Sequence, residues 1–236
     1  MGCSPFVGLD GCHLKNKYKG IMLSATALDA NSGLFPLAFA VVKSESGETW
    51  TWFLECLHEA NGMVDGFTFM SDRDKGLESI VPLVFPNVEH RTCVRHLSHY
   101  LTNNISESFN AWINKARVLP IVEMVDTIRQ KIMERMNSRR VMGSKWKGRI
   151  VPIAVKYIQS ITEDIGEYEV RRSDDYKAEV VGPYFRTGVR LDERTCTCRM
   201  WQVSGIPCVH AAAFISRVRG FNVIDIVDKY FSLEKF

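Results

Sequence analysis

Short apolar runs separated by turn residues occupy the first hundred positions of the chain. Trp52, Phe53 and Cys56 follow the spacing of one helix face, whereas most other runs are compact and apolar, as in strands. The turn Asn31-Ser32-Gly33 between two apolar runs indicates a hairpin. In order, the pattern predicts strands at 4–10, 20–29 and 37–42, a helix at 48–60, a strand at 67–70, a helix at 75–84 and a strand at 88–94. This order predicts an α/β fold with a mixed sheet.

The second half of the chain changes from helical to β-rich patterning. Residues 101–150 are expected to be mainly helical with a break at Pro120, and residues 167–191 return to β-rich runs. A helix of small residues is expected at 211–215, and the clearest boundary lies near Gly166. We therefore expect a core at 1–119, a basic helical region at 120–165 and a small β-rich domain at 166–236.

The composition is that of a globular protein. The 236 residues are 46% hydrophobic and 24% charged, which argues against a mainly disordered chain. Mean hydropathy is −0.09, and no apolar run approaches the roughly 18 residues of a membrane-spanning helix. The first residues lack the pattern of a signal peptide. We expect a soluble, intracellular protein without a membrane partner.

Charge is distributed unevenly along the chain, although the net charge is only +3. Residues 1–100 hold 8 Lys and Arg against 11 Asp and Glu, whereas residues 115–149 hold ten basic residues and three acidic ones. Such a basic stretch suits a polyanion such as nucleic acid, but a solvated helix face gives the same pattern.

Three of the seven cysteines cluster near the C-terminus together with a histidine. Cys196 and Cys198 form one close pair, and Cys208 and His210 form a second pair after nine intervening residues. Two such pairs provide the four ligands of tetrahedral Zn²⁺ and leave no open position, which indicates a structural ion. The alternative is three buried cysteines with a hydrogen-bonded histidine. The clustering of possible metal ligands points to a reducing compartment.

Three acidic residues lie where metal-dependent phosphoryl transfer would require them. Asp10 is expected to end the first strand, Asp72 the fourth, and Glu107 to open a helix. Carboxylates are the ligands of Mg²⁺, and a pair of such ions can activate the attacking oxygen and neutralise the leaving one. Each acid also has a structural interpretation: a turn at Asp10, a helix N-cap at Asp72 and a capping box of Asn104 with Glu107.

The cysteine cluster, with Trp201 and Gly205-Ile206-Pro207, resembles the SWIM zinc finger of plant transposases. The remaining motifs resemble the Mutator-like element (MULE) transposases, in the blocks 6–15, 18–20, 36–42, 48–52, 71–73, 93–96 and 103–110. The resemblance implies a shortened RNase H-like core with a DDE triad at Asp10, Asp72 and Glu107. It also implies Mg²⁺ or Mn²⁺ as the catalytic cofactor, structural Zn²⁺ at the finger and DNA as the partner.

The chain departs from the family between two of these blocks. Family members carry a long helical insertion between the Cys-x-x-His and Asn-Asn-x-x-Glu blocks, whereas Leu97–Leu101 joins them here. We also expect the N-terminal DNA-binding region of the family to be missing. Because the insertion would help to grip DNA, we expect weak or no transposition by this chain alone.

Three functions follow as hypotheses. In the first hypothesis, the chain is a DNA transposase that cleaves and transfers strands. Basic residues would then contact the phosphates, namely Arg129, Lys131, Arg139 and Arg140. Alternatively, it is a non-catalytic DNA-binding regulator, similar to the far-red-response regulators, or an inactive transposon remnant. A nuclear location and a homo-oligomer fit the first two hypotheses. Cys93 and His96 form a secondary metal-site hypothesis, with a buried thiol and a hydrogen-bonded histidine as the simpler interpretation.

Overall fold

A computed structural model describes residues 6–61, 67–71, 76–92, 104–163 and 165–236. The described residues up to 142 form one compact unit, and residues from 143 onward form a second. This division falls inside the predicted basic helical region, and the domain boundaries expected at 119/120 and 165/166 stay predictions. None of the helices in the described ranges is long and apolar enough to cross a membrane.

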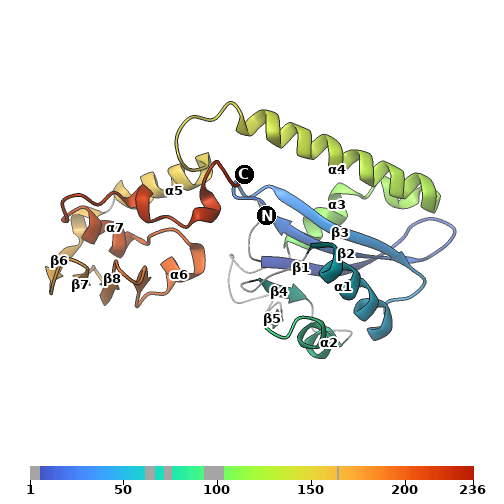
Figure 1. Ribbon diagram of the computed structural model, residues 1–236, viewed down its shortest axis with the longest axis horizontal. Helices are drawn as coiled ribbons and strands as arrows, with labels where there is room; N and C mark the ends of the chain where they lie inside the picture. The colour runs from blue at the N-terminus through green and yellow to red at the C-terminus, as the bar shows by residue number, and fades with distance from the viewer. Residues whose placement is uncertain (1–5, 62–66, 72–75, 93–103, 164) are drawn as a thin grey trace. The chain divides into compact units, whose positions relative to one another are not determined.

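A five-stranded mixed sheet forms the centre of the first unit (Figure 1). Its spatial order is β3-β2-β1-β4-β5, with the first three strands antiparallel and β4 and β5 parallel to β1. This is the RNase H-like arrangement of an α/β protein that the resemblance implies. The strands are β1 (Phe6–His13), β2 (Ile21–Leu28), β3 (Leu34–Val42), β4 (Thr68–Ser71) and β5 (Glu89–Thr92).

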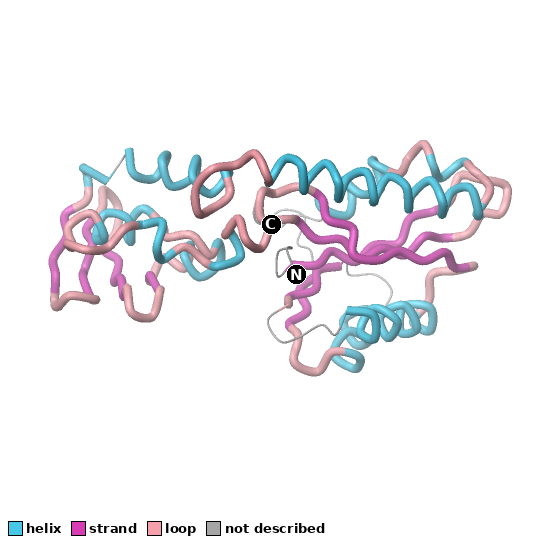
Figure 2. The backbone as a smooth tube through the Cα atoms, turned by 45° about the horizontal axis from the view of Figure 1, so that its top comes forward, coloured by secondary structure: helices cyan, strands magenta, loops and turns pink. Residues whose placement is uncertain are grey.

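Helices cover both faces of this sheet (Figure 2). The helices α1 (Gly47–Asn61) and α2 (Leu77–Val84) pack on one face, against Leu9 and its neighbours. The helices α3 (Asn104–Trp112) and α4 (Ile121–Gly143) pack on the other face, against Cys12 and Met22, and the short 3-10 turn Ala116–Val118 connects them. Both faces are therefore buried, as expected for a mixed α/β sheet.

The first strand is longer than the sequence pattern predicts. Asp10 was expected to end this strand or to open a turn with Gly11, but β1 continues to His13 because Asp10–His13 pair with Ser24–Ile21 of β2. Asp10 is therefore an interior residue of a central strand. Side chains alternate along a strand, so Asp10 shares a face with Cys12 and faces the side that α3 covers.

The second unit is small and β-rich, as expected. Its antiparallel sheet has the order β6-β7-β8-β9, and its core gathers Val180, Val189, Trp201 and Phe214. The strands are β6 (Glu169–Arg172), β7 (Lys177–Val181), β8 (Arg186–Arg190) and β9 (Thr195–Cys196). The helices are α5 (Pro152–Glu163), α6 (Met200–Ser204) and α7 (Val209–Ile215), with 3-10 turns at Ile165–Glu167, Val223–Ile226 and Lys229–Phe231.

Candidate functional site

Asp10 lies half-buried on the α3 side of the central strand. Its main-chain carbonyl accepts a hydrogen bond from the Ser24 hydroxyl at 3.3 Å. Its side-chain Oδ2 accepts one from Asn110 Nδ2 at 2.6 Å, across 100 positions of the sequence. This contact joins the strand that carries one predicted metal ligand to the helix that carries another.

Glu107 lies in the first turn of α3, as the sequence predicts. It precedes Asn110 by three residues, so the two side chains project from the same side of the helix. Phe109 and Ile113 of this segment are fully buried against the sheet and hold the helix in place. Glu107 itself is exposed. The fold thus brings the segments of Asp10 and Glu107 together.

The remaining residues predicted for this centre lie outside the described residues. These are Asp72, the third acid of the predicted triad, and Cys93 and His96, the secondary metal-site candidates. In the sequence, Asp72 directly follows Ser71, the last residue of β4. Its role and those of Cys93 and His96 stay predictions.

Cys12 is the titratable neighbour of Asp10 on the same face of β1. Burial raises the pKa of this thiol to about 11, and the Asp10 and Glu45 carboxylates act in the same direction, against the lowering effect of Arg117. The group is therefore a protonated, unreactive thiol at neutral pH.

A labelling experiment tests this environment. Iodoacetamide at pH 8 is expected to modify the exposed Cys56 of α1 and to spare Cys12, because only the thiolate reacts and Cys12 is both buried and protonated. Peptide mapping of the folded chain measures both sites, with the unfolded chain as the control in which both react. Equal labelling of the two thiols in the folded chain would contradict the buried placement of Cys12.

A second cluster lies in the C-terminal unit and unites four predicted zinc ligands. Cys196 ends β9, Cys198 follows in the next turn, Cys208 precedes α7, and His210 lies in its first turn. One donor atom from each residue lies within 4.8 Å of all the others. The Nδ1 atom of His210 is 3.9 Å from Cys196 Sγ and 3.8 Å from Cys208 Sγ. A nitrogen and a sulfur on one tetrahedral Zn²⁺ are about 3.5 Å apart, so the spacing of these donors is close to that which the ion needs.

The protonation of this cluster shows how closely its donors are packed. Hydrogen bonds from Cys196 and Cys208 hold the pKa of Cys198 far below its usual value. Hydrogen bonds with Cys196 and Cys198 raise the pKa of Cys208 far above its usual value. Hydrogen bonds to Cys196 and Cys198 raise the pKa of His210 to about 9. These shifts arise because the donor atoms lie close together, and this spacing suits one bound cation.

The turn between the two ligand pairs depends on a short helix and a glycine. Trp201 of α6 is buried, and its carbonyl accepts the Gly205 N–H at 2.8 Å. Gly205 has φ 72°, and a Cβ atom there would lie 3.0 Å from Asp228 Cβ, so glycine is required. These positions explain why Trp201 and Gly205 accompany the cysteines in the motif.

Three supporting residues were not singled out as site residues by the sequence analysis. Gln202 forms two hydrogen bonds with the backbone of Cys196. Its Oε1 accepts the Cys196 N–H at 3.3 Å, and its Nε2 donates to the Cys196 carbonyl at 2.9 Å. Tyr168 packs edge-on against the His210 ring, with centroids 5.4 Å apart. Asn110 holds Asp10. Only Asn110 has a usable sequence signal, because it lies one helical turn after Glu107.

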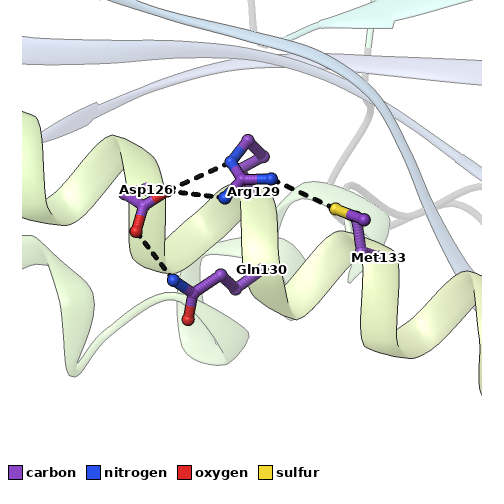
Figure 3. Close-up of polar contacts among 4 residues, drawn as sticks. All are labelled: Asp126, Arg129, Gln130 and Met133. Atoms are coloured by element: carbon purple, nitrogen blue, oxygen red, sulfur yellow. Dashed lines mark hydrogen bonds and ion pairs between the residues drawn. The ribbon is translucent and has the colours of Figure 1, made fainter.

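The basic residues predicted to meet phosphates have different surroundings along α4. Arg139 is buried and forms an ion pair with Asp29, with 2.9 Å between Nε and Oδ2, so the expectation that it meets phosphate is wrong. Arg129 is exposed and bonded to Asp126, which also accepts from Gln130 (Figure 3). Lys131 donates to the Trp112 carbonyl. Arg129 and Arg140 remain on the exposed surface.

Two solved structures are similar to part of this chain. The catalytic core domain of BIV integrase matches with 12% identity and a TM-score of 0.34, over 48% of this chain and 68% of that one. The simian T-cell lymphotropic virus intasome, in complex with the PP2A regulatory subunit B56 gamma, matches with 12% identity and a TM-score of 0.36. That match covers 52% of this chain and 45% of the other. No curated protein matches the sequence.

Two family models match different parts of the chain, one in each unit. The MULE transposase domain matches residues 6–100, a range that contains Asp10 and Asp72 and ends before Glu107. The SWIM zinc finger matches residues 176–218, which contain all four residues of the cysteine and histidine cluster. The chain therefore carries a MULE transposase domain followed by a C-terminal SWIM zinc finger.

Proposed function

We propose that this chain is a transposase-type protein that binds divalent metal ions at a DDE triad and cleaves and joins DNA strands. The observation that carries the proposal is the 2.6 Å bond between Asn110 and Asp10, which ties the helix of Glu107 to the strand of Asp10. This contact supports a shared site for two acids from distant parts of the sequence, on the face of the sheet that α3 covers. The MULE match supports a transposase-related function.

The third ligand is proposed from the strand register. Gly8 of β1 pairs with Met70 of the parallel strand β4. Asp10 and Asp72 are each two positions farther along the sequence, in the same direction. Residues at matching positions of parallel neighbours share a face and an edge of the sheet. We therefore propose Asp72 as the third metal ligand, at the sequence position that corresponds to Asp10.

The donor set fits a hard divalent cation. Asp10 and Glu107 offer carboxylate oxygens, one half-buried and one exposed, and such oxygens are preferred by Mg²⁺ and Mn²⁺. When bound, these ions supply charge neutralisation at the scissile phosphate and activation of the attacking oxygen. In the proposed site Asn110 bonds to Asp10, and Phe109 holds α3 against the sheet.

The C-terminal unit is proposed to hold one structural Zn²⁺ through Cys196, Cys198, Cys208 and His210. All four protein ligands are provided, so the site has no position for a reacting water. DNA is the proposed partner of the chain and the nucleus its proposed location. Exposed basic side chains of α4, such as Arg129 and Arg140, are available for phosphate contacts.

Metal-dependent nicking of labelled duplex DNA tests the catalytic proposal. Weak nicking is expected with Mg²⁺ or Mn²⁺ and an excess of protein, and none with chelator. Asp10→Asn and Glu107→Gln are each expected to lower the rate by about 100-fold or more, because each removes an ionised metal ligand. Asp126→Asn is the matched control, since Asp126 is an exposed carboxylate on α4 whose bonds go to Arg129 and Gln130.

Two results would count against catalysis. If the wild-type chain binds DNA but nicks it with neither metal, the non-catalytic regulator becomes the better description. If nicking persists in Asp10→Asn at the wild-type rate, it comes from a contaminating nuclease or from another site.

A further inference from the structure

We propose that Asn110 is the positioning residue of the metal site, holding the Asp10 carboxylate in the orientation that binds the ion. The inference rests on the proposed function. It assigns to Asn110 a role that acts through Asp10.

The hydrogen bond itself has a defined direction. An ionised carboxylate only accepts hydrogen bonds, so the side-chain amide of Asn110 meets Asp10 with its N–H group. The 2.6 Å distance from Nδ2 to Oδ2 is short, as expected when the acceptor is charged. A carboxylate has about four lone-pair sites, so one N–H on Oδ2 leaves acceptor capacity for metal ligation.

The oxygen of the same amide accepts no hydrogen bond from the residues that the structure describes. Asn110 Oδ1 is buried and has no hydrogen-bond partner among the described residues. A buried acceptor in this condition lowers stability, so the amide is a poor choice for stability alone. An apolar residue of similar shape would pack there without that cost. The residue is explained by what its N–H does for Asp10.

The position on α3 adds a second link to the site. Asn110 follows Glu107 by one turn, and Phe109 between them is fully buried. The helix therefore presents a metal ligand and the support of another ligand from one rigid segment. A shift of α3 would move Glu107 and Asn110 together. Because Asn110 holds Asp10, the position of Asp10 relative to Glu107 would be kept.

Asn114 provides the contrast within the same segment. It accepts a hydrogen bond from Lys15 Nζ at 2.9 Å at an exposed place. It is an asparagine of the same region with no contact to Asp10, and it is therefore the matched control.

The test measures Mn²⁺ binding to the full chain by calorimetry, with the metal alone as the probe, and nicking as a function of metal concentration. Asn110→Leu keeps the side-chain volume and removes the donor. It is expected to raise the Mn²⁺ dissociation constant and the metal concentration for half-maximal nicking by about tenfold or more, as for other partners of metal ligands. Asn110→Gln retains an N–H donor and is expected to recover part of the loss. Asn114→Leu is expected to match the wild type.

The outcomes separate the inference from the proposed function. If Asp10→Asn loses Mn²⁺ binding while Asn110→Leu retains wild-type affinity, the positioning role is overturned and the metal site stands. Asn110→Leu could instead lower the melting temperature while its folded fraction keeps the metal dependence of the wild type. Asn110 would then have a purely structural role, and this result also overturns the inference. If the wild-type chain neither binds Mn²⁺ nor nicks DNA, the proposed function and the inference fail together.

Discussion

Cys208→Ser is expected to abolish zinc binding and to unfold the C-terminal unit of the chain. Cys208 is 3% exposed and belongs to the same buried cluster as Trp201 and Phe214, so the ligand and the core form together. Zinc sites of this type contribute about 10–16 kcal/mol of apparent binding free energy, which is comparable to the usual 5–15 kcal/mol stability of a domain. Loss of the ion is therefore expected to remove the whole margin of stability.

The measurement combines zinc content with limited proteolysis of the full chain. One zinc per wild-type chain is expected, and EDTA treatment is expected to open the region from residue 143 onward to cleavage while the first unit stays resistant. Cys56→Ser is the matched control, since Cys56 is an exposed thiol on α1. A wild-type chain that contains no zinc, or a Cys208→Ser chain that is as resistant as the wild type, would contradict this prediction.

The cysteine and histidine cluster could be predicted from the sequence because its residues lie close together in the chain. Its ligands come from Cys196 to His210, and two close pairs separated by one short helix can meet with little contribution from the rest of the fold. Asp10 and Asn110 are 100 positions apart, and their contact exists only because α3 packs on the sheet through Phe109. Periodicity predicts a strand and a helix there but not which side chains face each other.

Two local signals gave the wrong expectation for reasons that tertiary pairing explains. Asp10-Gly11 is a common turn dipeptide, but the pairing of β1 with β2 continues the strand through it to His13. Arg139 occurs in a basic run and was expected on the surface, yet it is buried against the hairpin turn that follows β2. Nothing near Arg139 in the sequence indicates this, because its partner Asp29 is 110 positions away.

The hairpin turn that receives Arg139 depends on Asp29 in two ways. Asp29 Oδ1 accepts the backbone N–H groups of Asn31 and Gly33 at 2.9 and 2.7 Å, and Oδ2 faces Arg139 Nε at 2.9 Å. Arg139 also donates to the Leu34 carbonyl. The end of α4 is thereby attached to the β2–β3 hairpin by charge-assisted bonds in a buried place.

Arg139→Met is expected to destabilise the first unit by about 3–5 kcal/mol, because it leaves the Asp29 carboxylate buried without its cation. The double variant Asp29→Asn with Arg139→Met is expected to lose less than the two single variants together, since it removes both charges and keeps the turn acceptor. Urea unfolding of the full chain, followed by tryptophan fluorescence to which the buried Trp50 of the first unit contributes, measures both. Arg140→Met is the matched control: Arg140 is the exposed neighbour, and its bond to Asn137 Oδ1 at 3.2 Å is a surface contact worth little. Equal unfolding midpoints for Arg139→Met and Arg140→Met would mean that the ion pair does not hold α4 to the hairpin, because an uncompensated buried carboxylate cannot be without cost.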